Sequence, residues 1–235
     1  MEVFPGIEIR DLALYLKREK ILVVSDFHIG YEEALNKEGI LIPRFQFQEI
    51  IDKLNSILKN LELKKIVILG DLKHEFGMIS ETEWRNTLQL LDFLSSYCKN
   101  IILIKGNHDT VLGPIAAKRN INVKRFFRVG DFYFCHGHHI PKSVNSKVVI
   151  IGHEHPAVGL KKDSRVEVFK CFLKGSWHGK ALIVMPSFNL VTEGTDILKD
   201  EILSPFLKQN LSFFEVFIVS DKVYYFGRIK DVKGL

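Results

Sequence analysis

The chain has 235 residues, of which 46% are hydrophobic and 26% are charged, values of a globular protein with a sizeable core. No apolar run approaches the roughly 18 residues of a membrane span, and the N-terminus lacks the basic start and apolar stretch of a signal peptide. We therefore expect a cytoplasmic protein that does not insert into a membrane, whose net charge of +5 permits a polyanionic partner without establishing one.

The first half of the chain alternates between expected strands and expected helices. Short aliphatic runs at 21–24, 66–69 and 101–104 are typical of buried strands. Between them, apolar positions from Phe47 to Leu61 follow helical spacing, with Pro43 in the first turn, and a second helix over 80–97 opens with the capping-box sequence "SETE". This order predicts parallel βαβ units.

The second half of the chain is rich in expected strands. They are predicted at 132–136, 148–151, 165–174, 181–188 and 213–229, the last with a hairpin turn at 220–221. A chain that begins as βαβ and continues as β suggests two sheets packed face to face with helices outside. Without a linker, a repeat or a low-complexity segment, residues 1–235 are predicted to form one domain.

Polar clusters follow five of the expected strands directly. They are "DFH" at 26–28, "GD" at 70–71, "GNHD" at 106–109, "HGHH" at 136–139 and "GHEH" at 152–155. Ligand sites of α/β sheets lie beyond the carboxyl ends of the strands, so we expect the five clusters to converge. A single Asp or His after a strand is more often a turn residue, and only the joint pattern points to a site.

The residue types in these clusters are those of a metal site without thiolates. Seven candidate ligands offer carboxylate, amide or imidazole groups: Asp26, His28, Asp71, Asn107, His136, His153 and His155. Seven ligands are too many for one tetrahedral ion and suit two ions that share a carboxylate, the usual device for displacement at phosphorus. On this interpretation, His153 and His155 serve different ions.

Several other kinds of site are unsupported by the sequence. There is no HExxH, no GxxxxGK[ST] loop and no GxSxG elbow. The three cysteines, Cys98, Cys135 and Cys171, form no CxxC pair, so neither a thiolate zinc site nor a disulfide framework is expected. Each lies among apolar residues and is predicted to fill core.

These motifs resemble those of the calcineurin-like metallophosphoesterase superfamily. "GDLKHEFG", "GNHDT", "HGHHIPK", "GHEHPA" and "MPSFNLVTEGTD" are in particular similar to the PdeM-like and archaeal SbcD-related phosphoesterases. The resemblance implies a four-layer αββα sandwich, with two mixed β-sheets flanked by helices. It also implies phosphodiesterase activity, makes nucleic acid a candidate substrate and implies a link to DNA-repair helicases or a ligase.

The resemblance also implies a role for each residue of the site. Asp26, His28 and His155 would hold the first ion, Asn107, His136 and His153 the second, and Asp71 would bridge them. The ions would be Mn²⁺, with Fe, Zn or Ni as alternatives, and a hydroxide between them would attack phosphorus. His108 would protonate the leaving group, with Asp109 orienting its imidazole.

Other polar residues near the motifs have weaker assignments. His74, His138 and His139 are candidates for substrate binding. Lys142 could neutralise a phosphate but is more often solvent-facing, Trp177 is expected in the core, and His178 is left unassigned. Glu154 is expected to face solvent or to support a ligand.

Three functions are compatible with the sequence. The first is a dinuclear phosphodiesterase acting on DNA, RNA or nucleotide-like diesters. The second is the same chemistry on cyclic nucleotides or monoesters. The third is a binding module recruited to a repair helicase, although such a module would not need all seven ligands and His108. The oligomeric state stays open.

Overall fold

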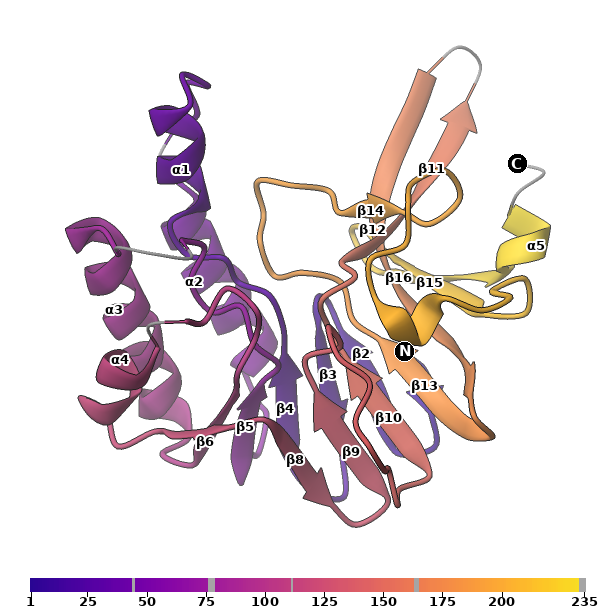
Figure 1. Cartoon of the computed structure of the whole chain (residues 1–235), viewed down its shortest axis with the longest axis horizontal. Coiled ribbons are helices and arrows are strands. Elements are labelled where there is room, and N and C mark those ends of the chain that lie inside the picture. Colours follow the sequence, from indigo (N-terminus) through magenta and orange to yellow (C-terminus); the bar gives the residue numbers. More distant parts are fainter. Residues whose placement is uncertain (44, 76–78, 111, 163–164, 233–235) are drawn as a thin grey trace.

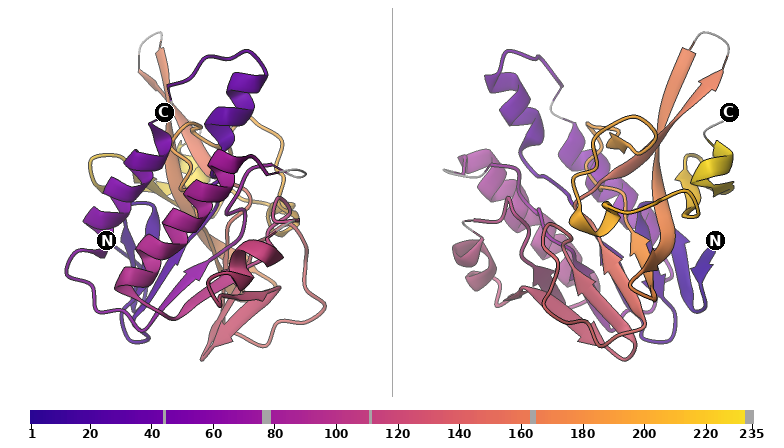
Figure 2. Two further views of the ribbon diagram at one scale, coloured as in Figure 1. Left: turned by 90° about the vertical axis from the view of Figure 1, so that its left-hand side faces the viewer. Right: turned by 45° about the vertical axis from the view of Figure 1, so that its right-hand side comes forward.

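The fold is a sandwich of two mixed β-sheets, seen edge-on in Figure 1 and turned in Figure 2. The computed structural model describes residues 1–43, 45–75, 79–110, 112–162 and 165–232. Helices α1 to α4 lie on one side of the sandwich, and the 3-10 helix η1 and α5 on the other (Figure 1). Their bounds are α1 Tyr31–Lys37, α2 Gln46–Leu58, α3 Glu81–Tyr97, α4 Gly113–Ala117, η1 Pro205–Leu207 and α5 Ile229–Val232.

The first sheet runs in sequence order from β1 to β7. Its strands are β1 Glu2–Phe4, β2 Ile7–Arg10, β3 Ala13–Leu16, β4 Ile21–Val24, β5 Lys65–Ile68, β6 Ile101–Ile104 and β7 Asn122–Lys124. Strands β4 to β7 are parallel, which confirms the predicted βαβ order. Strands β1, β2 and β3, which form an antiparallel meander with the predicted strand β4, were not among the predicted strands.

The second sheet follows the order β14-β11-β12-β13-β10-β9-β8, and β12 also pairs with β15, which pairs with β16. Its strands are β8 Phe126–Val129, β9 Phe132–Cys135, β10 Val148–Ile151, β11 Pro156–Lys162, β12 Arg165–Trp177, β13 Lys180–Val184, β14 Thr195–Asp196, β15 Glu215–Val219 and β16 Val223–Arg228. Strands β9, β10 and β13 are parallel. The hairpin predicted near residue 220 joins β15 to β16.

Three apolar clusters hold the layers together. One lies between the sheets and includes Val67 and Ile150. A second packs α2, α3 and α4 on the first sheet, and a third covers the outer face of the second sheet, where Trp177 lies against Phe206 of η1. This arrangement confirms the predicted two-sheet sandwich with helices outside. All three cysteines are buried, as expected.

The helices agree with their sequence patterns except at their ends. Buried residues of α2 follow the predicted stripe, but the helix begins at Gln46, so Pro43 precedes it instead of occupying its first turn. Ser80 caps α3 by accepting a hydrogen bond from the backbone N–H of Glu83 at 3.1 Å. None of the helices in the described part of the chain combines the length and the apolar composition that a bilayer crossing requires.

Candidate metal centre

The five polar clusters lie at the carboxyl ends of β4, β5 and β6 in the first sheet and of β9 and β10 in the second. Backbone hydrogen bonds join neighbouring loops to one another. His28 N–H donates to the carbonyl of Asp71 at 2.9 Å, and Gly152 N–H donates to that of His136 at 2.9 Å. The predicted convergence at the strand ends is therefore present, and both sheets contribute to it.

The backbone at the candidate ligands is unusual. Ten non-glycine residues of the described chain have positive φ, and half of them are candidate ligands. Their φ values lie between 45° and 66°, and they are Asp26, His28, Asp71, His153 and His155. Asp and His tolerate this left-handed conformation better than most residues. With this backbone, alternate side chains of the loops at 26–28 and 153–155, together with Asp71, reach the groups of potential ligand atoms.

Two groups of potential ligand atoms lie side by side. Within each group the atoms are within 4.8 Å of one another, and the groups are Asp26 with His28 and His155, and Asp71 with His136 and His153. Asp71 Oδ2 lies 3.3 Å from Nε2 of His136 and 3.7 Å from Nε2 of His28. Asp71 therefore reaches both groups. The amide oxygen of Asn107 is 2.9 Å from Nε2 of His136 and belongs with the second group.

The donor set fits divalent cations. Nε2 of His28 and Nε2 of His155 are 3.4 Å apart, and Oδ1 of Asp26 is 3.3 Å from the latter. Oδ1 of Asp26 is also fully buried and lacks a conventional hydrogen-bond partner in the described structure. A buried carboxylate oxygen facing two imidazole nitrogens is the arrangement that a shared cation satisfies.

The protonation states favour ionised carboxylates in the site. Burial opposes the charged form of Asp26, but His155 and His136 lower the pKa of this carboxyl below its ordinary value. Asp71 is likewise buried, and its contacts with His136 lower its pKa. Burial would lower the pKa of His136, but its contacts with Asp71 and Asp26 outweigh burial and raise it to about 9.

Two other imidazoles of the site, His28 and His153, have lowered pKa values. Burial, followed by the nearby His155, lowers the pKa of His28 to about 3. Burial also lowers the pKa of His153 to about 4, with a further contribution from His136. A neutral imidazole is the form that coordinates metal, so these two side chains are in the binding state at pH 7.

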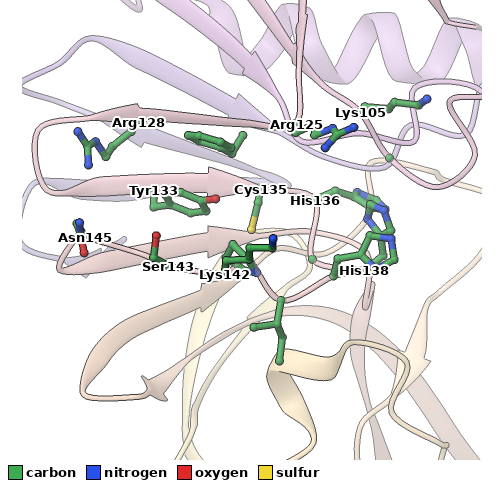
Figure 3. Close-up of a pocket in the computed structure, with 16 residues that line it drawn as sticks. Lys105, Arg125, Arg128, Tyr133, Cys135, His136, His138, Lys142, Ser143 and Asn145 are labelled. Atoms are coloured by element: carbon green, nitrogen blue, oxygen red, sulfur yellow. The ribbon is translucent and has the colours of Figure 1, made fainter.

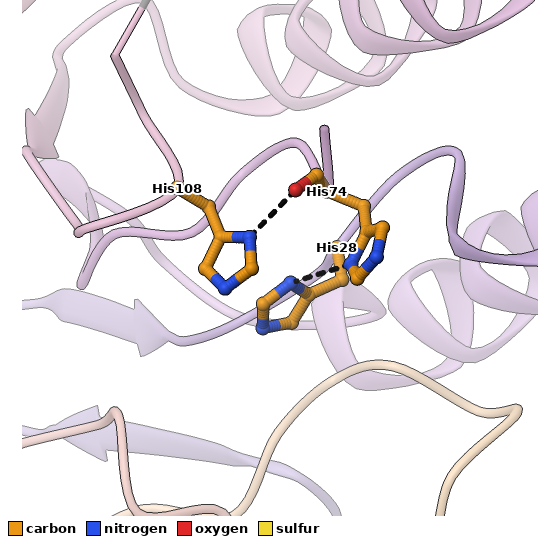
Figure 4. A group of neighbouring side chains, drawn as sticks. All are labelled: His28, His74 and His108. Carbon is orange, nitrogen blue, oxygen red and sulfur yellow. Dashed lines mark hydrogen bonds between the residues drawn. The ribbon is translucent and has the colours of Figure 1, made fainter. Parts of the chain in front are cut away.

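His108 is positioned by three backbone contacts. Its Nδ1 lies 2.6 Å from the carbonyl oxygen of His74, as Figure 4 shows. Its backbone N–H donates to Oδ1 of Asp71, and its carbonyl accepts from Nζ of Lys73 at 2.7 Å. The imidazole packs edge-on against His28, with ring centroids 4.8 Å apart.

Asp109 has a different environment from the one predicted. Its two carboxylate oxygens accept from the backbone N–H groups of Gly106 and Leu72, at 2.9 and 3.1 Å. The acceptor at Nδ1 of His108 is the carbonyl of His74, so this carbonyl orients the imidazole. Burial and the negative charge of Asp71 raise the pKa of Asp109 to about 6. Asp109 thus connects the β5 and β6 loops.

His74 lies within the same group of rings. Its Nδ1 is 3.4 Å from Nδ1 of His28, and its ring stacks on that of His108 at 5.3 Å (Figure 4). The three histidines also form a third group of potential ligand atoms. Burial lowers the pKa of His74 to about 4. His74 therefore lies directly beside the candidate metal ligand His28.

Two supporting residues were missed by the sequence reasoning. The Glu83 carboxylate accepts from the backbone N–H groups of His74 and Glu75, at 2.9 and 3.0 Å, instead of completing the capping box. Lys73 is fully buried and donates to the carbonyls of His108 and Glu75. The "SETE" sequence marks Glu83 as a helix residue, but nothing local reveals that it holds the His74 loop.

Glu154 is the clearest correction among the weaker assignments. The side chain does not face solvent, because it is 0% exposed and accepts from the backbone N–H groups of Leu203 and Ser204. Ser204 Oγ in turn donates to the carbonyl of Gly137 at 2.9 Å. Glu154 therefore joins the loop after β10 to the segment before η1 through hydrogen bonds.

The remaining assigned residues divide between the site and the rest of the fold. The His138 ring lies 5.1 Å from that of His136 and 4.0 Å from that of His139. Lys142 is exposed beside them, at the pocket shown in Figure 3. Trp177 is buried in the core as predicted, and His178 lies in the turn between β12 and β13, outside the ligand groups.

Two mixed sheets with carboxylates and imidazoles gathered at their strand ends are typical of a metal-dependent hydrolase. The sequence matches the family model of the calcineurin-like phosphoesterases over residues 19–185. The chain therefore belongs to the calcineurin-like phosphoesterase family, whose members are metal-dependent phosphoester hydrolases. A comparison with curated proteins gives no match.

Solved structures share the fold. The nuclease MPE of Pseudomonas putida is 21% identical, with a TM-score of 0.66 and 92% of each chain covered. Yfce, a phosphoesterase from E. coli, is less similar: it is 13% identical with a TM-score of 0.42, and the match covers 89% of this chain and 97% of the other. Vps29 of Entamoeba histolytica complexed with zinc is 20% identical with a TM-score of 0.39, and the match covers 87% of this chain and 96% of the other.

Proposed function

We propose that this protein is a phosphodiesterase that uses two divalent metal ions to cleave nucleic acid or nucleotide-like diesters. The observation that carries the proposal is the carboxylate of Asp71, which lies within 3.7 Å of ring nitrogens from both ligand groups. One carboxylate shared by two ligand groups is the arrangement of two-metal phosphoester hydrolysis. The likeness to a nuclease, which covers 92% of each chain, supports a diester substrate.

The residues would divide the work as follows. Asp26, His28 and His155 would hold one ion, and Asn107, His136 and His153 the other, with Asp71 between them. Two ions, with Mn²⁺ the leading candidate, would neutralise the phosphoryl oxygens and the charge that develops as the diester breaks.

His108 would protonate the departing oxygen. Its Nδ1 is committed to the carbonyl of His74, so Nε2 is the atom that would transfer the proton. Lys73 and Asp71 hold the His108 backbone on both sides, so the imidazole has little freedom to leave this position. These contacts support the assignment of His108 as an oriented general acid next to the ligand groups.

An assay panel with added Mn²⁺ tests the proposal. The substrates are bis-p-nitrophenyl phosphate, the corresponding monoester, cyclic nucleotides and short DNA and RNA. We expect diester and oligonucleotide cleavage that EDTA abolishes and that Asp71→Ala abolishes, while Asp221→Ala, an exposed carboxylate of the β15–β16 turn, retains it. Cleavage of small esters alone would favour the second function, and no cleavage by metal-loaded protein would refute the enzyme.

The proposal extends to a partner and a location. The resemblance to PdeM-like and SbcD-related enzymes makes a DNA-repair helicase the candidate partner and the cytoplasm the candidate compartment. Co-purification of the tagged chain from its own cells, with the helicase identified by mass spectrometry, tests the partner. Loss of the helicase after nuclease treatment would attribute the association to shared nucleic acid instead.

A further inference from the structure

A pocket of about 850 Å³ opens directly beside the second ligand group. Its inner end is formed by His136 and His138, and it extends along the β8–β9 hairpin as far as Arg128 (Figure 3). Segment 139–145 forms the opposite wall. The pocket therefore begins where the scissile phosphate would be bound and leads away from it along the edge of the second sheet.

The pocket is strongly basic. Four cationic side chains line it: Lys105, Arg125, Arg128 and Lys142. None of the 16 described residues that line it is an aspartate or a glutamate. All four cations are exposed. A row of unopposed cations that starts at the catalytic groups attracts a polyanion that continues beyond the reacting phosphate.

The pocket also has an aromatic platform. Phe126 is 51% exposed, and its ring stacks on that of Tyr133 with centroids 5.2 Å apart and planes 16° from parallel. In the β8–β9 register Phe126 lies opposite Cys135 and Arg128 opposite Tyr133, so these side chains share one face of the hairpin. Phe126 therefore adds an exposed, flat apolar ring to the pocket that Arg125 and Arg128 also line.

We propose that this basic pocket binds a single-stranded nucleic-acid segment next to the scissile phosphate, with Arg125 and Arg128 on its phosphates and Phe126 stacked on a base. The inference rests on the proposed function and specifies its substrate. Cations along a groove combined with an exposed aromatic ring are how proteins hold single strands. A duplex keeps its bases stacked inside and offers none to Phe126.

Binding measured without catalysis tests the pocket directly. The probe is a fluorescein-labelled oligodeoxythymidylate of about twelve residues, measured by anisotropy in EDTA so that it is not cleaved. Arg125→Gln/Arg128→Gln should weaken binding about tenfold and reduce the slope of log K against log salt by about 1.4, roughly 0.7 per lost phosphate contact. The control Arg18→Gln/Arg85→Gln, two exposed arginines outside the pocket, should leave both unchanged.

The aromatic contribution has its own variant and control. Phe126→Ala should weaken binding roughly tenfold without changing the salt slope, because it removes stacking and no charge. Phe213→Ala, which removes a 61% exposed ring elsewhere, should have no effect. Equal affinity for a duplex of the same length, with the same dependence on Phe126, would overturn the single-strand assignment. If polyglutamate displaced the labelled oligonucleotide as well as unlabelled oligonucleotide does, the pocket would bind any polyanion, and the single-strand assignment would again be overturned.

Turnover separates this inference from the proposed function. With Mn²⁺, the pocket variants should still hydrolyse bis-p-nitrophenyl phosphate, because none of the altered side chains is a candidate metal ligand or the proposed general acid, and they should have a raised KM for oligonucleotide only. An unchanged KM for oligonucleotide in Arg125→Gln/Arg128→Gln would refute the proposed binding role of the pocket. It would not contradict the proposed phosphodiesterase activity. Absent turnover of every substrate by the unaltered protein would refute the proposed function instead.

Discussion

Replacing Gly106 with alanine should disable the metal centre without touching a candidate ligand. A Cβ at Gly106 would lie 2.0 Å from Oδ1 and 2.4 Å from the backbone nitrogen of Asp71, where ordinary contact begins at 3.4 Å. The two loops must therefore separate by about 1.4 Å at Oδ1. Because Asp71 reaches both ligand groups, this displacement acts on both at once.

The size of the effect follows from that displacement. Misplacing reacting groups by about 1 Å costs roughly 10²-fold in rate, so we expect at least this loss for bis-p-nitrophenyl phosphate. Overpacking costs about 1–3 kcal/mol, which lowers the melting temperature by roughly 2–4 °C per kcal/mol in a chain of this size.

The control is a glycine with open space around it. At Gly113, the first residue of α4, no atom in the described part of the chain lies within 4 Å of an added Cβ. Gly113→Ala should keep turnover, Mn²⁺ stoichiometry by calorimetry and melting temperature. If Gly106→Ala kept its Mn²⁺ stoichiometry and its turnover within a few-fold of the unaltered protein, the close approach of Gly106 to Asp71 would have no part in building the site.

Three further outcomes are expected. His108→Ala should lower turnover by roughly 10²–10⁴-fold with Mn²⁺ stoichiometry intact, whereas His178→Ala should change neither, and metal loss in the former would make His108 a ligand. The raised pKa of His136 means that its proton stabilises the metal-free protein below about pH 6.5, and that this contribution is lost toward pH 9. Mn²⁺ must displace that proton, so the gain in melting temperature on adding Mn²⁺ should grow from pH 6.5 to 9, and a constant gain would contradict it. Ser80→Ala removes the cap of α3 and should cost about 1 kcal/mol by urea unfolding, against no loss for the exposed Ser56→Ala on α2.

Much of the fold could be predicted from the pattern of hydrophobic residues in the sequence. The runs at Ile21–Val24 and Val148–Ile151 are buried at every position, and each is followed by polar residues that have no place in a core. The same contrast located the candidate site, since parallel strands bring their carboxyl ends to one edge.

The elements that were missed depend on neighbours far away in sequence. Strands β1 and β8 have three and four residues, and β8 has alternating exposed and half-buried positions that resemble solvated loop. The environments of Glu83 and Glu154 were also unpredictable, because each carboxylate meets backbone N–H groups of a segment that only the tertiary fold brings near. Local sequence identifies which residues are polar, but not which distant amides they will meet.

The left-handed backbone at the ligands has a consequence for how this scaffold can change. A non-glycine residue held in the left-handed region lowers the stability of the fold by an amount of order 1–3 kcal/mol, and the cost for Asp and His is near the lower limit. Glycine would relieve that strain at positions such as Asp71 or His153 and would abolish a ligand. A descendant that no longer needed the proposed metal centre could therefore become more stable by single substitutions at these positions, so metal binding and the stability of the scaffold make opposing demands on the same residues.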